Sequence, residues 1–466
     1  MNLTGTGYLV LILGYSGLLV AVGLWLSRNV RSTKDFFVAG RDMPAGLIFS
    51  TFLAANIGAG STVGATGLGY SHGLSAVWWV GSAGLGSLVL AFWVGPKIYE
   101  LARTYNFYTV GDFLEARFSR ALRLLFATLL WIGSLFILAG QLIAIAIILE
   151  VTAGLPKELG CMLGGLVVAA YFAAGGLKTT AWLNVIQMSL KMLGFLVVVP
   201  WALSKIGGWA ALETPSVPAG YLSPMGIGAK GVFDYLVVIV PSFFISPGLL
   251  QKLYGARNAG AVRRGVGAQA VALLLYAPLP AILGMVAHTA YPGLSDPELA
   301  LPTVLTQMLP WWMGALLLAA VFSAELSASD AVLFMLSTSL SKDLYKGYLN
   351  PAASEQNLLR ASRFIAAVAG VLGVGLAILL PSVVTALKVF YSLLTVVLVV
   401  PLLAGLYLKF PSARAAMIAM IASPGVALLA HLLTDGRGLG VLNPVALGII
   451  AGVAVMGIFG VIHHAK

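Results

Sequence analysis

Three ionisable side chains lie inside long apolar stretches of this 466-residue chain, where a charge is costly to bury. Lys191 stands in the middle of one such stretch, and Glu325 and Asp330 stand in another. Ionisable residues at that depth usually serve a function; the alternative for Lys191 is a side chain that reaches back to an interface. Asn184 precedes Lys191 by seven residues, so the two lie about 20° apart on one helix face.

The second stretch places its polar groups around one face of a helix. If Ala324 marks that face, Ser327 and Ala328 share it, and Glu325 and Asp330 flank it on either side. The two carboxylates are expected to pair with the buried lysine or to help hold a cation. A purely structural buried pair is the alternative.

Two apolar stretches contain residues that interrupt helices. The stretch 46–71 is rich in glycine from position 58 onward, and the stretch 231–254 contains Pro241 and then Ser246-Pro247-Gly248. Proline removes a backbone donor and clashes with the preceding turn, and unwound backbone at membrane depth is tolerated only where it lines a cavity. We therefore expect two interrupted helices with a solute bound between the breaks. The alternative is that the glycines only allow close helix packing.

Uncharged polar and aromatic residues near the two breaks are candidates for binding that solute. Exposed backbone together with convergent polar groups favours a binding site at this depth. The candidate solute-binding residues are Asn56, Gly60, Ser61, Trp78, Gln141, Phe243 and Ser246, with Trp79 and Phe244 as neighbours. The aromatic residues can equally serve as packing or interfacial anchors.

Composition indicates which elements position these residues. Sixty per cent of the chain is hydrophobic and 9% is charged, whereas a soluble domain carries about 25% charged residues. Apolar stretches of about 20 residues or more, enough to cross a bilayer, recur along the chain, without the alternation of a β-barrel. The sequence predicts an all-α polytopic membrane protein with about 13 transmembrane helices. The expected spans are 4–26, 46–71, 75–101, 120–150, 156–175, 180–205, 231–254, 262–291, 309–341, 358–381, 383–408, 413–434 and 441–463.

The basic residues follow the loops. The net charge is +11, and with the N-terminus outside, most Lys and Arg residues fall in cytoplasmic loops, Lys252 and Arg263 among them. This asymmetry is the positive-inside rule, so the charge indicates orientation rather than nucleic-acid binding. We expect a multi-pass protein integral to the cytoplasmic (plasma) membrane, with the N-terminus outside and the C-terminus inside. The single cysteine, Cys161, permits no internal disulfide.

Four stretches resemble one known family. They are Thr33–Pro44 (TKDFFVAGRDMP), Leu53–Gly64 (LAANIGAGSTVG), Gly175–Gln187 (GGLKTTAWLNVIQ) and Ala319–Lys346, which ends in SASDAVLFMLSTSLSKDLYK. Over roughly residues 30–410 the chain is similar to the sodium/solute symporter family. The resemblance implies the LeuT-type fold, with a 5+5 inverted repeat. Its parts would be a leading transmembrane helix in 1–30, a transporter core in 31–410 whose two five-helix repeats cover about 46–205 and 231–408, and two trailing transmembrane helices in 411–466.

The same resemblance implies a sodium ion and no organic cofactor. Carried over position by position, the implied sodium ligands are Ala54, Ile57, Ala324, Ser327 and Ala328. Ala328 departs from the family pattern, which has Ser or Thr there, and Asn184 departs from a signature that has Asp. One ligand oxygen is therefore lost, and Lys191 could put an ammonium in place of the ion. The candidates for coupling are Asn184, Lys191, Glu325 and Asp330.

Together, these features predict a secondary active transporter that imports a small organic solute, coupled to sodium, by alternating access. Within the same fold, the alternative is proton-coupled or ion-independent transport with Lys191 replacing sodium. A channel, from a different class, would need a continuous polar pore. No zinc, Ser-His or paired-carboxylate motif supports an enzyme, and the tail after residue 463 leaves no room for the output domain of a sensor. The expected partners are the solute and the lipid bilayer, with no nucleic acid and no obligate protein partner. The solute stays open among sugars, amino acids, monocarboxylates, vitamins, quaternary amines and urea.

Overall fold

The computed structural model describes residues 3–27, 39–173, 177–213, 217–408 and 412–464. Within these ranges the regular structure is helical, and β contacts are limited to two isolated bridges. Residues 33–38 of the first family-like stretch and residues 175–176 of the third lie outside the described residues.

Nine helical stretches among the described residues are long and apolar enough to cross a membrane. The chain is therefore a helical multi-pass membrane protein, while the count of thirteen spans and the inverted repeat stay predictions. The helices are α1 (Leu3–Ser27), α3 (Ala45–Asn56), α4 (Val63–His72), α5 (Val77–Val89), α6 (Gly95–Thr104), α7 (Val110–Arg117), α8 (Arg120–Ala153), α9 (Lys157–Ala173), α10 (Leu177–Lys205), α11 (Gly228–Ile245), α12 (Pro247–Tyr254), α13 (Ala259–Tyr276), α14 (Pro278–Ala290), α15 (Ala300–Gln307), α16 (Trp311–Thr338), α17 (Glu355–Leu379), α18 (Val383–Tyr407), α19 (Ala413–Leu433) and α20 (Pro444–His464).

Both expected helix interruptions are present. After α3 the backbone leaves helical geometry at Ile57 (φ −105°, ψ 74°), forms a short turn at Ala59–Ser61 and resumes as α4. Between α11 and α12 the break is confined to Ser246 (φ −53°, ψ 119°), directly before Pro247. Pro241, in contrast, lies within α11 without ending it.

Glycines outside the first break allow close helix packing. A Cβ added at Gly284 of α14 would lie 2.7 Å from the carbonyl carbon of Gly69 in α4 and would overlap the carbonyl oxygen of Thr66. Backbone thus meets backbone where α4 crosses α14, as small residues permit in membranes. The glycine-rich stretch 58–69 therefore serves both purposes, with its first part at the break and its last part in packing.

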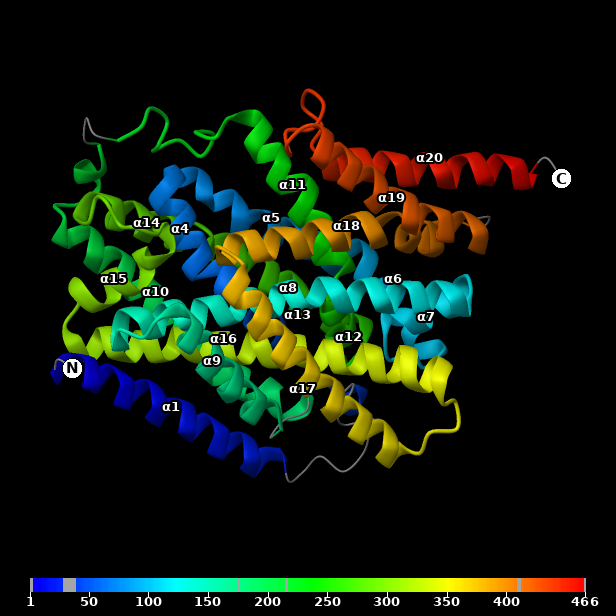
Figure 1. Cartoon of the computed structure of the whole chain (residues 1–466), viewed down its shortest axis with the longest axis horizontal. Coiled ribbons are helices and arrows are strands. Elements are labelled where there is room, and N and C mark those ends of the chain that lie inside the picture. Colours follow the sequence, from blue (N-terminus) through cyan, green and yellow to red (C-terminus); the bar gives the residue numbers. More distant parts are fainter. Residues whose placement is uncertain (1–2, 28–38, 174–176, 214–216, 409–411, 465–466) are drawn as a thin grey trace.

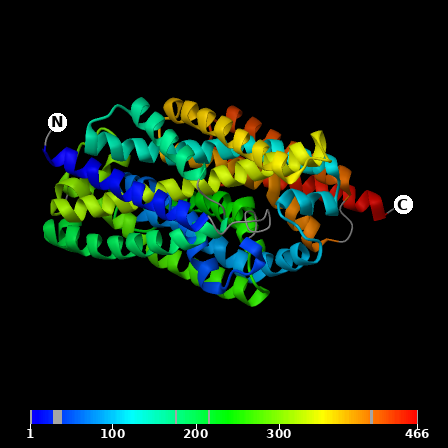
Figure 2. The same ribbon diagram turned by 90° about the horizontal axis from the view of Figure 1, so that it is seen from below.

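The long helices run mostly along the long axis of the molecule, with α1 at the lower edge (Figure 1), and the view from below shows α1 lying across the outer face of the bundle (Figure 2). α16 is buried over most of its length. α17 and α19 expose large apolar side chains such as Phe364, Val371 and Leu432. An apolar exterior around a buried central helix is the arrangement expected in lipid.

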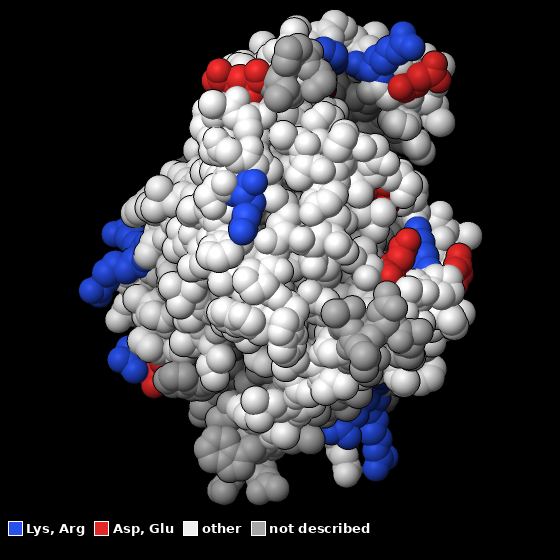
Figure 3. All heavy atoms as spheres, turned by 90° about the vertical axis from the view of Figure 1, so that its left-hand side faces the viewer, with Lys and Arg blue, Asp and Glu red and all other residues white. Residues whose placement is uncertain are grey.

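Figure 3 shows the molecule end-on, from the side that holds the N-terminus in Figure 1. Uncharged atoms make up most of this face, and the charged side chains on it are scattered. Lys and Arg side chains appear at several places on it, and the orientation of the chain in the membrane stays a prediction.

Candidate solute and cation site

The buried lysine contacts the first helix break directly. Lys191, on α10, is 1% exposed, and its Nζ donates a hydrogen bond to the carbonyl oxygen of Ile57 at 2.7 Å. That carbonyl is free of the helical ladder because α3 ends at Asn56. The Lys191 ammonium group therefore lies beside the break, in contact with the Ile57 carbonyl oxygen.

Glu325 lies close to the same break. Its Oε1 accepts a hydrogen bond from the Thr62 hydroxyl at 2.9 Å, and its Oε2 is buried without a hydrogen-bond partner. Glu325 and Lys191 attract each other electrostatically, yet no ion pair joins them in the described part of the chain. The carboxylate thus balances the lysine's charge without a direct contact.

The positions implied for a sodium ion include the carbonyl that this lysine contacts, and they do not fit the ion as they are arranged. Ile57 already accepts the Lys191 ammonium. Ser327 donates its hydroxyl proton to Asn184 Oδ1 at 2.6 Å, and Ala328 offers no side-chain oxygen. Ala54 and Ala324 are buried in the adjoining helices. A sodium ion here would meet a positive charge and too few free oxygens.

A cavity lies between the two breaks. Its walls come from both broken helices, and a second hollow with shared walls adjoins it. Of the residues expected to bind solute, Asn56, Gln141, Phe243 and Ser246 line the cavity, and Gly60 and Ser61 line the adjoining hollow. The structure therefore brings six of the seven candidates to one place.

Side chains around the hollow hold the unwound backbone. The amide of Ala59 donates to Gln141 Oε1 at 3.0 Å, and Trp79 Nε1 donates to the Gly60 carbonyl oxygen at 2.7 Å. The Tyr276 hydroxyl donates to the carbonyl oxygen of Ser61 at 3.1 Å. Backbone groups freed by the break are thereby satisfied inside the protein, as they must be at membrane depth.

Trp78 is the expected site residue that the structure places elsewhere. Its Nε1 donates to the carbonyl oxygen of Pro224 at 2.9 Å, in the segment before α11. Trp79, the next residue on α5, takes the position near the cavity. Adjacent residues on a helix point about 100° apart, so only one of the pair can face the site.

Lys252 corrects the sequence analysis, which counted it among the cytoplasmic loop residues. It lies on α12, is 7% exposed and lines the cavity. Asp330 attracts Lys252 rather than Lys191. The positive-inside count assigns any lysine near the end of a span to a loop, whereas α12 stays enclosed by other helices. One feature of the sequence indicated that Lys252 is buried, namely its position inside the predicted span 231–254.

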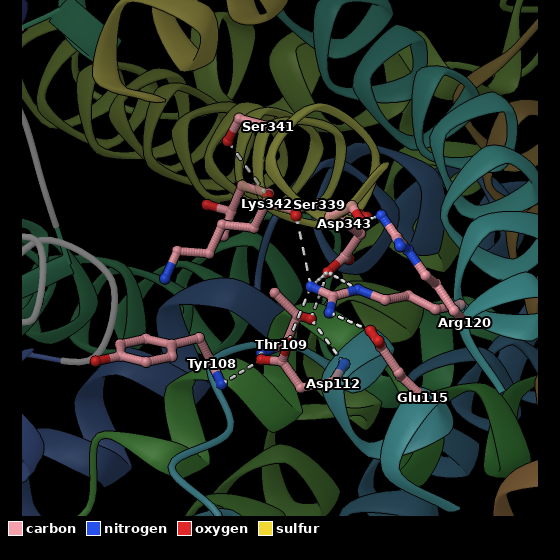
Figure 4. Close-up of polar contacts among 12 residues, drawn as sticks. Tyr108, Thr109, Asp112, Glu115, Arg120, Ser339, Ser341, Lys342 and Asp343 are labelled. Atoms are coloured by element: carbon pink, nitrogen blue, oxygen red, sulfur yellow. Dashed lines mark hydrogen bonds and ion pairs between the residues drawn. The ribbon is translucent and has the colours of Figure 1, made fainter. Parts of the chain in front are cut away.

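A second polar cluster, not expected from the sequence, lies at the opposite end of the molecule from the N-terminus (Figure 4). Arg123 at the start of α8 forms ion pairs with Asp112 at 2.9 Å, Glu115 at 2.6 Å and Asp343 at 2.6 Å. Asp343 also accepts a hydrogen bond from Thr109 at 2.8 Å. These contacts tie α7 and α8 to the segment after α16.

A helical membrane protein whose two interrupted helices enclose a cavity has the architecture of a solute transporter. The chain belongs to the Sodium:solute symporter family, whose sequence profile matches residues 36–423. Membership makes it a transporter rather than an enzyme, in a family for which sodium is the expected coupling ion.

Two relatives and one solved structure illustrate the similarity. The sodium/glucose cotransporter of Vibrio parahaemolyticus is 28% identical over 89% of this chain and 83% of its own length. The sodium/pantothenate symporter of Escherichia coli K12 is 28% identical over 89% of this chain and 87% of its own length. An outward-open, substrate-bound Na⁺-coupled sialic acid symporter superposes with a TM-score of 0.84 at 18% identity, covering 98% of both chains, which shows a shared fold.

Proposed function

We propose that this chain imports a small organic solute by alternating access, with the solute bound in the cavity between the breaks of α3–α4 and α11–α12. The proposal rests on one observation: polar groups from both broken helices line this cavity, Asn56 and Ser246 among them. Broken helices let two parts of a bundle rock about a fixed site. A screen of radiolabelled solutes competing for uptake into proteoliposomes tests the proposal. The absence of any saturable uptake would contradict it.

We further propose that Lys191 supplies the cation at the position where the family implies sodium. The supporting observation is the 2.7 Å hydrogen bond from its ammonium to the Ile57 carbonyl oxygen. An ammonium and a sodium ion both satisfy carbonyl oxygens with positive charge, but the lysine is tethered and can exchange a proton. Loss of that proton would remove the charge from the break, so proton transfer and the conformation of α3–α4 would be linked.

Sodium coupling is the second candidate function, favoured by the family to which the chain belongs. It would require Lys191 to leave the Ile57 carbonyl so that sodium could take its place beside Ser327. The two candidates therefore predict different responses to sodium.

The discriminating experiment compares the thermal unfolding midpoint of the purified chain in sodium chloride and in potassium chloride, together with solute uptake under sodium and pH gradients. With Lys191 as the cation, the wild-type midpoint is the same in both salts, and uptake follows the pH gradient. Lys191→Ala should lose the pH-driven uptake, and the matched variant Lys388→Ala, altered at a lysine outside the break, should retain it. A sodium-specific rise in the wild-type midpoint that Ser327→Ala abolishes would establish sodium coupling instead.

A further inference from the structure

The buried lysine on α12 has no place in the coupling scheme above. Lys252 lines the cavity at 7% exposure, and no hydrogen bond joins its ammonium group to a described residue. Lysine has three donor hydrogens and no acceptor. Burying such a group without a partner costs several kcal/mol or more, so its position facing the cavity requires an explanation.

Asp330 does not satisfy this lysine by itself. The carboxylate attracts Lys252 electrostatically, but no ion pair between them occurs among the described residues. Asp330 is also not one of the residues that line the cavity. The charge that the cavity presents to a solute is therefore positive.

A second unpaired donor lies in the same wall. The Asn56 Nδ2 group is buried without a hydrogen-bond partner, and Asn56 lines both the cavity and the adjoining hollow. Among the described residues, no acidic side chain lines either space. The remaining wall is largely apolar, with Phe243, Val332 and Met335. The cavity thus combines donors with an apolar surface.

We propose that the solute is an organic monocarboxylate, whose carboxylate binds Lys252 and Asn56 and whose apolar body packs against Phe243, Val332 and Met335. This inference rests on the proposed transport function and specifies its substrate class. A carboxylate offers acceptors to both unpaired donors, and hydrogen bonds to charged groups are the stronger kind. A neutral solute would leave the ammonium buried and unsatisfied.

Matched pairs of small solutes test this assignment. Each pair consists of a carboxylate and its primary amide, isovalerate with isovaleramide and phenylacetate with phenylacetamide, so that shape is kept and charge is removed. Binding is measured as the rise in the thermal unfolding midpoint of the purified full chain, which reports occupancy of the folded state. We expect the carboxylates to bind about tenfold or more tightly than the amides. Lys252→Met should abolish this preference, and Lys388→Met, altered at a lysine outside the cavity lining, should retain it.

Further variants separate recognition from a structural role. If Lys252 only neutralises Asp330, the double variant Lys252→Met with Asp330→Asn would recover the carboxylate response, and this result would overturn the inference. Equal binding of amide and carboxylate by the wild type would also overturn it. Lys252→Arg keeps a cation in place and should retain part of the preference. Saturable uptake of neutral solutes alone would leave the proposed function standing and refute the monocarboxylate, whereas the absence of all uptake by the folded chain would refute both.

Discussion

At the scale of single residues, the site is organised around backbone groups that a helix would otherwise conceal. Lys191 donates a hydrogen bond to the Ile57 carbonyl oxygen, and Gln141 accepts one from the Ala59 amide. One side chain therefore pairs with a backbone acceptor at the break, and the other pairs with a backbone donor. Gln141 also lines the cavity. Gln141 therefore both stabilises the break and is placed to respond to what binds in the cavity.

The first prediction concerns Gln141. Gln141→Leu removes the side-chain oxygen that accepts from the Ala59 amide, and we expect it to cost about 1–3 kcal/mol of stability. The measurement is the thermal unfolding midpoint of the purified protein. Gln307→Leu, at an exposed position on α15, is the matched control and should change the midpoint little. Equal midpoints for Gln141→Leu and wild type would show that the hydrogen bond contributes nothing.

At the scale of elements, two contacts of α4 depend on glycines that a larger residue could not replace without strain. α4 meets α14 backbone to backbone at Gly69 and Gly284. Two residues earlier in α4, a Cβ added at Gly67 would lie 3.1 Å from Glu298, which caps the first turn of α18. The position of α4 is thereby fixed by both neighbours.

We expect Gly284→Ala to destabilise the protein by about 1–3 kcal/mol because the added methyl group overpacks a backbone contact that cannot yield. In α17, a Cβ at Gly375 would meet nothing within 4 Å, so Gly375→Ala should be neutral or slightly stabilising. Unfolding midpoints of the two variants, measured side by side, check the expectation. A smaller loss for Gly284→Ala than for Gly375→Ala would contradict the observed crossing.

Glu298 predicts a pH dependence of stability. It lies outside the membrane-spanning helices, is 4% exposed and accepts from the amides of Val383 at 2.8 Å and Val384 at 3.0 Å. Burial raises the pKa of Glu298 from 4.5 to about 7. A carboxyl with a raised pKa contributes stability that is fully present below its ordinary pKa and is lost as the pH rises through the raised value.

The expected loss between about pH 5 and about pH 8 is on the order of 3 kcal/mol. Unfolding midpoints across that pH range test it. Glu298→Gln cannot ionise and should flatten this part of the profile, whereas Glu158→Gln, at an exposed position, should keep the wild-type profile. A wild-type profile that rises toward pH 8 would have the opposite sign and refute the assignment.

At the scale of the whole molecule, contacts at both ends hold the bundle around the cavity. Near the N-terminal end, Glu298 ties the loop before α15 to α18. At the opposite end, Arg123 ties α7 and α8 to the segment after α16 (Figure 4). Alternating access, as proposed for this chain, requires one set of contacts to separate while the other holds.

The predicted orientation can be tested with single cysteines in a Cys161→Ala background. An impermeant thiol reagent added to intact cells should modify Arg437→Cys and spare Arg263→Cys, because the positive-inside rule places Arg263 in the cytoplasm. Both arginines are exposed in the structure. Permeabilised cells, in which both positions should react, provide the control. Labelling of Arg263→Cys in intact cells would reverse the topology.

The sequence alone determined the helical class, the two breaks and four residues of the cavity lining, Asn56, Gln141, Phe243 and Ser246. These features are local: an apolar run of sufficient length must be helical in lipid, and Ser246-Pro247-Gly248 favours a helix break, although Pro241 alone does not end α11. Asn56 and Gln141 were found because polar residues are few in such stretches. The resemblance to a known family added the residues expected to hold a cation at the break, which composition could not provide.

Only the tertiary structure decided how the buried charges pair. Helical geometry placed Glu325 and Asp330 on two sides of one face, and both were candidates for Lys191. The fold brings Glu325 near Lys191 and Thr62, and it brings Asp330 near Lys252, a residue the sequence had assigned to a loop. Lys191 and Ile57 are 134 positions apart. The choice among partners so distant in sequence depends on which helices cross and at what depth. Packing of the whole bundle, rather than local sequence pattern, sets these crossings.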